Sequence, residues 1–438
     1  MSGRAVSEET VDRSTRLASP VDIASPALYL DGIPHEGFAA IRETDGLVWH
    51  PYGPVGDDGA DGGFWAVTRH ADVREMSRNP ELFSSAIGHT NLWDLEADAL
   101  EARRSLIDSD APDHTRLRRV VSRAFTPKNT RNWEGMARDI AAELVEDFAA
   151  GGGGGWVEQV AAPLPIRVIL AILGVPLEDA DYLVEWTNHL VGGTGDASSL
   201  PDDAYGNTTP TRLLPFNSPA SHALFEHAEK MRQLRLAEPG DDLVTGLLEA
   251  EADGERLSAN EYRNFFQLLV FAGNETTRTA MIHGALAFAE HPEQWATLRD
   301  DPSLITGAVD EVIRWATPVL HMRRTATTDT ELAGTAIAEG DKVVMWYAGA
   351  NRDPEVFPAP FRFDVTRSDN PHFAFGGGGP HFCLGAFLAR MEIQVLLEEM
   401  VARNVVLEPG SAPVRLASNF VHGVASLDLG VAPSGEGG

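Results

Sequence analysis

The stretch FAFGGGGPHFCLG, residues 373–385, contains the only cysteine of this 438-residue chain. The residues after Cys383, up to position 404, space their apolar side chains as an amphipathic helix does. Cys383 is therefore expected just before or at a helix N-terminus, where free backbone N–H groups and the helix dipole favour a thiolate. The glycines at 376–379 and Gly385 let the backbone approach closely, so that several N–H groups can point at one sulfur. A lone cysteine is usually an inert core residue, but this context predicts a thiolate site.

A single cysteine excludes an internal disulfide and any site that needs several cysteines, such as an iron–sulfur cluster. Three roles remain for Cys383: packing, nucleophilic catalysis, or service as one metal ligand. A nucleophile needs a base oriented by a third group, and His381 is the candidate base, although no oxyanion-loop signature accompanies it. A thiolate bound to heme iron fits better, because a soft anionic ligand pushes electron density onto iron and favours O–O cleavage.

The stretch resembles the heme-ligand loop of cytochrome P450 enzymes, Phe-Gly-x-Gly-x-(His/Arg)-x-Cys-x-Gly, at Phe375, Gly376, His381, Cys383 and Gly385. The resemblance implies heme b with Cys383 as axial iron ligand. It also implies the P450 fold, a triangular, mostly α prism with small β-sheets and the heme between a distal and a proximal helix. The loop is one residue longer than the common form. This longer loop resembles that of a bacterial branch of the family that acts on steroids, branched lipids and terpenoids. The segments RRTAT (323–327) and SNFVHGVASL (418–427) resemble the same branch.

A second motif, FAGNETTRT at 271–279, interrupts an apolar helix pattern with polar residues and a glycine. A glycine inside a helix lowers helix stability by about 1 kcal/mol relative to alanine. The motif is therefore compatible with three structures: a kink, a tolerated polar patch, or a widened turn that admits a ligand. The motif resembles the family's distal-helix signature at Ala272, Gly273, Glu275, Thr276 and Thr277. The resemblance implies that Glu275 and Thr276 relay protons to the activated oxygen, and we expect burial or the kink to tune the pKa of Glu275.

The segments EVIR (311–314) and PFRF (360–363) supply a further match. Alone, Glu311 and Arg314 at i, i+3 spacing are weak evidence. Together with the second segment they resemble the family's buried charge triad, which implies Glu311, Arg314 and Arg362 as a structural lock.

Heme propionates need cations if they are sheltered from water. His114 and Arg118, one helical turn apart in DHTRLRR (113–119), resemble the family's propionate clamp. The resemblance extends to Arg324 and His381 as the other propionate ligands.

By family position, the substrate chamber is expected to be lined from 84–105, 268–272, 317–322 and 418–423. The apolar candidates are compatible with a hydrophobic substrate, but they would be equally compatible with an ordinary hydrophobic core. They are Leu268, Leu269, Val319, Leu320, Met322, Phe420 and Val421, with Trp93 as a cap over the chamber.

The formal net charge of −30 disfavours binding to nucleic acid or anionic membranes. No long apolar stretch or signal sequence occurs, so we expect a soluble, cytoplasmic protein, most simply a monomer. Arg116, Arg118, Arg119, Arg123, Lys128 and Arg131 form a basic stretch that is either a solvated helix face or a docking site for an acidic partner. No flavin- or nucleotide-binding stretch follows the cysteine helix, so the resemblance implies a separate ferredoxin and reductase that bring electrons from NAD(P)H.

Helical periodicity covers 134–149, 162–173, 177–191, 220–236, 258–290, 303–315 and 384–403, and short strands are expected at 47–50, 64–68, 323–333, 342–347 and 412–430. We expect a flexible segment over 1–25, one catalytic domain over 26–430 and a tail over 431–438. The glycines at 151–155 are interpreted as a flexible surface turn, and 192–219 as a lid or a disordered insertion.

The implied reaction is a heme-thiolate monooxygenation, in which one atom of O2 enters a C–H or C=C bond of a hydrophobic small molecule. Two alternatives share the heme: a peroxide-driven relative, which typically lacks the acid–alcohol pair, and a non-catalytic heme-binding sensor, which needs no proton relay.

Overall fold

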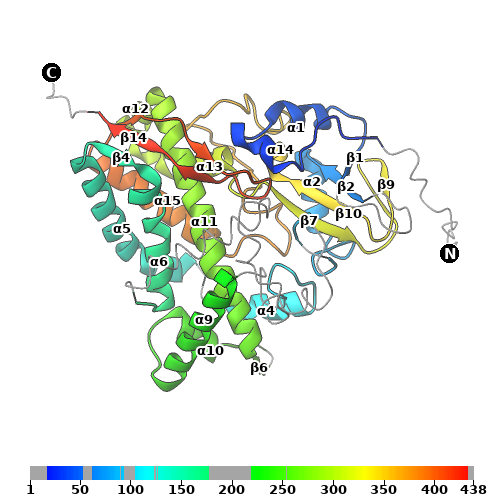
Figure 1. Ribbon diagram of the computed structural model, residues 1–438, viewed down its shortest axis with the longest axis horizontal. Helices are drawn as coiled ribbons and strands as arrows, with labels where there is room; N and C mark the ends of the chain where they lie inside the picture. Colours follow the sequence, from blue (N-terminus) through cyan, green and yellow to red (C-terminus); the bar gives the residue numbers. More distant parts are fainter. Residues whose placement is uncertain are drawn as a thin grey trace.

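The computed structural model describes residues 17–52, 62–88, 90–92, 104–122, 125, 127–176, 219–252 and 254–432. Its ribbon has a triangular outline, with long helices on one side and a five-stranded sheet flanked by short helices on the other (Figure 1). The mostly α fold with small sheets is confirmed. None of the described helices combines the length and apolar character needed to cross a membrane.

The long helices pack around α11, Ala259–Glu290, which is buried on every side along most of its length. A capping box starts α11, because Ser258 and Glu261 each accept a hydrogen bond from the other's backbone N–H. Helices α6 (Pro163–Leu173), α9 (Pro219–Ala237), α13 (Ile305–Ala316) and α15 (Ala386–Ala402) pack on α11, and α5 (Pro127–Ala150) packs on α15 and α6.

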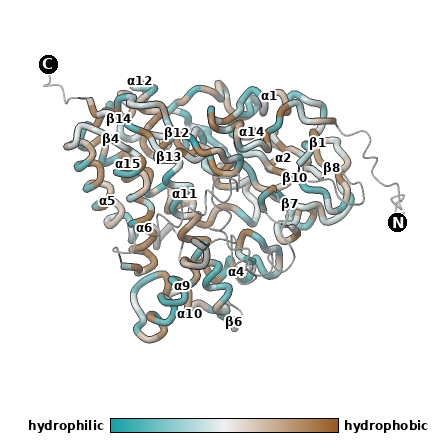
Figure 2. Tube along the Cα trace, viewed as in Figure 1, coloured by the Kyte–Doolittle hydropathy of each residue, from teal (hydrophilic) through white to brown (hydrophobic). Residues whose placement is uncertain are grey.

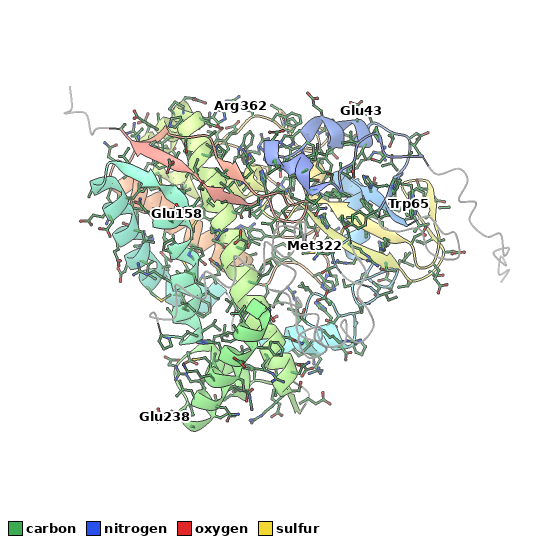
Figure 3. The ribbon with its side chains drawn as sticks, in the orientation of Figure 1. Glu43, Trp65, Glu158, Glu238, Met322 and Arg362 are labelled. Carbon is green, nitrogen blue, oxygen red and sulfur yellow. The ribbon has the colours of Figure 1, made fainter. Side chains whose placement is uncertain are left out.

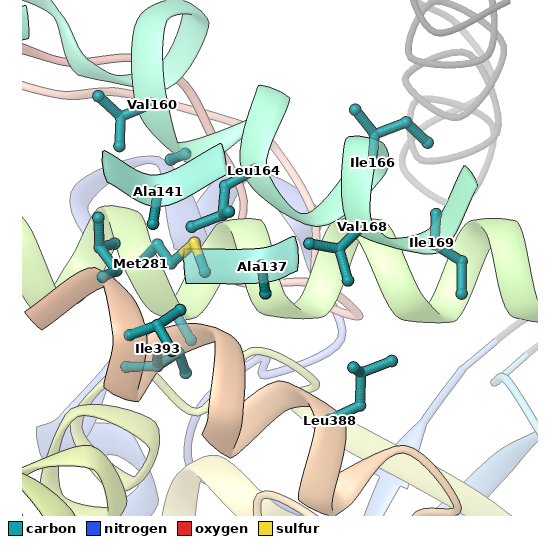
Figure 4. Packing of buried hydrophobic residues seen from close by; sticks show 14 of the residues in the cluster. Ala137, Ala141, Val160, Leu164, Ile166, Val168, Ile169, Met281, Leu388 and Ile393 are labelled. Atoms are coloured by element: carbon teal, nitrogen blue, oxygen red, sulfur yellow. The ribbon is translucent and has the colours of Figure 1, made fainter. Parts of the chain in front are cut away.

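Apolar side chains from α5, α6, α11 and α15 interdigitate in one core, shown around Met281 in Figure 4. The hydropathy colouring in Figure 2 marks α6 as hydrophobic through most of its length. Its sequence, PLPIRVILAIL, is almost entirely apolar, which suits a helix buried between α5 and α11.

The main sheet has the strand order β1-β2-β10-β7-β3 and separates two smaller cores. Its strands are β1 (Val48–Pro51), β2 (Gly63–Val67), β3 (Phe83–Ser84), β7 (His321–Ala326) and β10 (Lys342–Trp346). Because side chains alternate along a strand, Trp65 and Val67 enter one core while Phe64 and Ala66 enter the other.

The other described α-helices are α1 (His35–Arg42), α2 (His70–Arg78), α4 (Asp113–Ser122), α10 (Leu243–Glu249), α12 (Pro292–Asp300) and α14 (Tyr347–Ala350). Short 3-10 helices lie at Pro26–Asp31 and Pro302–Leu304, and a π-helical turn at Val157–Ala161. The remaining strands are β4 (Gly153–Gly155), β5 (Glu251–Ala252), β6 (Glu255–Arg256), β8 (Thr330–Leu332), β9 (Thr335–Ile337), β11 (Leu407–Pro409), β12 (Val414–Arg415), β13 (Val424–Ser426) and β14 (Asp428–Val431).

Six of the seven predicted helices correspond to α5, α6, α9, α11, α13 and α15, with shifted ends. The helix predicted at 177–191 lies outside the described residues, as does nearly all of 192–219. The interpretation of 151–155 as a flexible turn was wrong for its second half. There β4 pairs with β14, and a Cβ on Gly153 would lie 2.2 Å from the carbonyl oxygen of Leu429, so close pairing requires glycine.

The charge triad was predicted with one wrong member. Glu311 is fully buried and binds Arg314 at 2.7 Å (Nη2–Oε1) and Arg367 at 3.1 Å (Nε–Oε2). Arg362 instead exposes 65% of its side chain and approaches Asp364 only to 4.0 Å (Nε–Oδ2), and Figure 3 shows it at the outer edge of the molecule. Its carbonyl oxygen still accepts from Arg314 (3.3 Å), so the segment contributes its backbone and leaves the ion pair to Arg367.

Arg367→Ala is expected to lower the free energy of unfolding by about 3 kcal/mol, because it removes one partner of a buried carboxylate. Arg362→Ala, the matched control, is expected to change it by less than about 0.5 kcal/mol. Denaturant unfolding of both variants measures the difference. Equal losses would contradict the assignment of Arg367 to the triad.

Candidate active site

One large cavity, of about 270 Å³, lies at the centre of the described chain. Helix α11 lines one wall, and the cysteine loop with the start of α15 lines the wall opposite. Further lining residues come from β7, from 105–108 and from 420–421, with Met322 of β7 labelled near the middle of Figure 3. The cavity therefore joins the two motifs that the sequence singled out, although they lie far apart in the chain.

The cysteine loop closes as a hairpin, in which the N–H of Cys383 donates to the carbonyl of Phe375 at 2.9 Å. Gly376 and Gly378 have φ of 93° and 84°, which favours glycine. Gly377 and Gly379 instead allow the loop to lie close to α2, because a Cβ on either would be 2.2 Å or less from an atom of Ser77 in that helix. The glycine-rich loop is thus anchored on α2.

Cys383 lies three residues before the first residue of α15, as expected, and its side chain faces the cavity. Burial raises the pKa of the thiol, whereas a hydrogen bond from the backbone of Gly385 and the charges of Arg118 and Arg390 lower it. Among the loop glycines expected to point N–H groups at the sulfur, Gly385 provides a hydrogen bond that lowers the thiol pKa. Arg118 also donates to the carbonyl of Phe382 at 2.5 Å, so its charge is fixed beside the loop.

Basic side chains converge at one end of the cavity. Arg118, Arg324 and His381 line it, and the ring of His114 lies 4.2 Å from that of His381. Burial and the neighbouring arginines lower the pKa of His381 to about 2 and that of His114 to about 4. The structure thus brings together all four residues predicted to bind propionates, in a pocket whose charge favours an anion.

His381 does not act as a base toward Cys383. Its Nε2 contacts the hydroxyl of Ser85 at 3.1 Å, and an imidazole with a pKa near 2 cannot take a proton from a thiol whose pKa is raised. The contact with Ser85 and the lowered pKa of His381 both disfavour the nucleophilic interpretation of Cys383.

On the opposite wall, Glu275 and Thr276 sit side by side in α11 and both line the cavity. Glu275 is 1% exposed; burial raises its pKa, and Arg278, whose Nη2 lies 3.0 Å from Oε1, lowers it. Thr276 donates its hydroxyl to the carbonyl of Ala272 at 2.7 Å. The α-helix is continuous through this motif. Of the two expected causes of a pKa shift at Glu275, burial raises the pKa, and Arg278 opposes it.

The apolar part of the cavity contains Leu268, Leu269, Val319, Met322, Phe420 and Val421, as predicted. The prediction for Leu320 was wrong, because this residue, just before β7, is fully buried in a separate core and does not line the cavity. Trp93 lies outside the described residues.

Two ionisable residues escaped the sequence interpretation: Arg278, which pairs with the cavity residue Glu275, and Glu392, which lines the cavity itself. Arg278 follows Glu275 at i+3, a spacing that the sequence displays. Glu392 of α15 is 1% exposed, its Oε2 has no hydrogen-bond partner among the residues that the structure describes, and burial raises its pKa well above the usual range. An acid on the apolar face of LARMEIQVLL was the available signal.

Comparisons with known proteins agree with this arrangement. The family model described as Cytochrome P450 matches residues 216–424. The chain is 39% identical to the steroid C26-monooxygenase of Mycolicibacterium smegmatis, over 96% of each chain. It is 40% identical to the methyl-branched lipid omega-hydroxylase of Mycobacterium bovis, over 91% of each. A solved Mycobacterium marinum cytochrome P450 in complex with pseudoionone has a TM-score of 0.84 and 37% identity, and the match covers 95% of this chain and 100% of that one.

A thiol at the start of a proximal helix, facing a buried acid and alcohol across an apolar cavity, defines the heme-thiolate class of oxygenase. The chain belongs to the cytochrome P450 family. It is accordingly a monooxygenase, an oxidoreductase that uses heme iron, O2 and electrons derived from NAD(P)H.

The residues present fit that cofactor. The only cysteine of the chain faces the cavity, and a Cβ built on Gly385 meets no atom within 4 Å, which leaves open space beside the thiol. At the end where Arg118, Arg324 and His381 converge, two carboxylates would offset the clustered positive charge.

Proposed function

We propose that this P450 hydroxylates a steroid or a methyl-branched lipid, with electrons supplied by a separate ferredoxin and its reductase. The observation that carries the proposal is the placement of the acid–alcohol pair, Glu275 and Thr276, across an apolar cavity from Cys383. The activities for which the two relatives are named support the substrate class. Residues 26–430 are proposed to act as one catalytic unit.

In this proposal Cys383 would bind the heme iron through its thiolate, and Arg118, Arg324, His381 and His114 would hold the propionates. When bound, the heme supplies the reductive activation of O2 and the transfer of one oxygen atom to the substrate. The glycine N–H at 385 and the guanidinium of Arg118 stabilise negative charge on Sγ of Cys383.

The opposite wall is proposed to supply protons and to exclude water. Glu275 has a raised pKa, so its carboxyl holds a proton to higher pH than an exposed glutamate does. Thr276 lies next to it and partly faces the cavity, so its oxygen can accept a proton from Glu275 and pass one onward. The apolar side chains of Leu268, Val319 and Phe420 hold the substrate and keep bulk water away.

The basic residues at 116–131 are proposed to contribute to docking of an acidic ferredoxin. Arg116 contributes little, because Glu261 and Glu255 already pair with it. Arg119 and Arg131 are exposed, and Arg123 and Lys128 lie outside the residues whose side chains are described.

Optical titration of the ferric protein with steroids, methyl-branched lipids and terpenoids tests the substrate class. We expect a ligand of one of the first two classes to displace water from the cavity. The iron should then change from low to high spin, which shifts the Soret band. The same ligand should drive NAD(P)H consumption with ferredoxin and reductase, and Thr276→Ala should keep that consumption but lose most of the product.

Other outcomes contradict the proposal in distinct ways. Turnover with peroxide alone, insensitive to Thr276→Ala, would indicate a peroxide-driven enzyme. A thiolate-type spectrum without turnover for any ligand would indicate a sensor.

A further inference from the structure

Near the cysteine loop, an ion pair joins α13 to α15. Nε of Arg390 in α15 lies 2.8 Å from Oδ1 of Asp310 in α13, and each side chain is 32% exposed. Burial raises the pKa of Asp310, yet the hydrogen bond from His372 and the charge of Arg390 bring it below its usual value. Asp310 is therefore an anion that fixes the arginine in place.

His372 adds a third arm to this cluster. The N–H of Ala374 donates to Nδ1 of His372 at 3.3 Å, so Nε2 carries the proton and donates to Oδ1 of Asp310 at 3.2 Å. Burial lowers the pKa of His372, which agrees with a neutral ring. Asp310 thus holds both Arg390 and the segment that enters the cysteine loop.

The held guanidinium covers Phe375, the aromatic residue at the base of the cysteine loop. The Cζ of Arg390 lies 4.4 Å from the centroid of the Phe375 ring, within the range of a cation–π contact. The backbone of Phe375 accepts the hydrogen bond from Cys383, so a shift of this residue is transmitted to the cysteine. Both residues line the cavity.

We propose that Asp310 and Arg390 form a clamp that positions Phe375 and fixes a positive charge beside Cys383, and thereby sets how readily the bound heme accepts its first electron. The inference rests on the proposed function, because it requires Cys383 to bind the iron. Reduction by one electron, supplied by the redox partner, makes the heme–thiolate unit more negative by one charge. A fixed cation nearby favours that state, so the clamp raises the reduction potential. Asp310 and Arg390 are positioning residues, since neither lines the cavity.

A dye-mediated titration of the heme-loaded protein, without redox partner, measures the ferric/ferrous potential directly. Arg390→Gln removes the charge and keeps a side chain of similar length, so we expect a more negative potential. The equilibrium constant for uptake of the first electron should fall by up to about tenfold, which corresponds to about 59 mV. Arg390→Lys keeps the charge but loses the planar stack, so its potential should lie between those of Arg390→Gln and the unmodified protein. Arg74→Gln is the matched control: Arg74 is exposed and stands 6.0 Å over the ring of Phe373 rather than Phe375.

A second readout covers the case in which Arg390→Gln binds heme poorly. The ferrous–CO spectrum of Arg390→Lys and Asp310→Asn should show a larger fraction without the thiolate-type band, whereas Arg74→Gln should match the unmodified protein. Potentials and spectra of the Arg390 variants equal to those of Arg74→Gln would overturn the clamp and leave the proposed function intact. An unmodified protein that lacks the thiolate-type band would overturn the proposed function itself.

Discussion

Cys383→Ser is expected to lose both the thiolate-type spectrum of its ferrous–CO complex and essentially all product formation. Cys383 is the only cysteine, so no other thiolate can replace it. A serine oxygen is a harder and far more basic donor, which does not push electron density onto iron in the same way. The loop should survive, because its hairpin bond uses the backbone N–H of residue 383 rather than the side chain.

Two measurements separate lost ligation from lost folding. Far-ultraviolet circular dichroism should be unchanged, and extracted heme should remain near one per chain if Arg118, Arg324 and His381 hold the propionates. Gly385→Ala serves as a matched loop variant: Gly385 has φ −82°, which alanine adopts, and its Cβ meets no protein atom, so an unloaded protein should fold normally. If Cys383→Ser kept a thiolate-type spectrum, the assignment of the ligand would be wrong.

The cysteine loop and the acid–alcohol pair could be predicted because each lies within a dozen residues, where helix start, glycine content and chemistry are read together. The Glu311–Arg314 pair followed for the same reason, since both lie on one helix turn. Arg362 and Arg367 could not be told apart, because the chain reverses after Ala359, which has a positive φ of 49°, and that reversal brings Arg367 back to Glu311.

The error at Leu320 has a simpler cause. Val319 bridges to Val421 in an extended segment, and neighbours in such a segment point to opposite sides. The prediction for 317–322 did not take this alternation into account. Val319 lies on the cavity side of the segment, and Leu320 points into the core on the other side. The Gly153–Gly155 strand was missed because glycines show no strand pattern; its partner β14 supplies the only signal.

Glu275→Gln is expected to slow product formation about 10²-fold or more, the range of general acid catalysis. Glutamine keeps the size of the side chain and an oxygen that can accept from Arg278, but it cannot give up a proton and regain it. Substrate-induced spectral shifts should be retained, because the apolar wall is untouched. The measurement is product formed per heme with saturating ferredoxin and reductase. An unchanged rate would remove Glu275 from the proton path.

The pH dependence gives the sharper test, because Arg278 and burial act on Glu275 in opposite directions. Burial raises the pKa of Glu275 and Arg278 lowers it, so Arg278→Gln should raise it further. If proton donation by the Glu275 carboxyl limits turnover, the rate falls as pH rises through this pKa, and the falling limb should move to higher pH in Arg278→Gln. The variant then retains more of its own maximal rate at alkaline pH than the unmodified enzyme, and Glu275→Gln shows no such limb. A limb that stays fixed in Arg278→Gln, or moves to lower pH, would mean that another group titrates, and the unpaired acid Glu392 in the same cavity would be the next to replace.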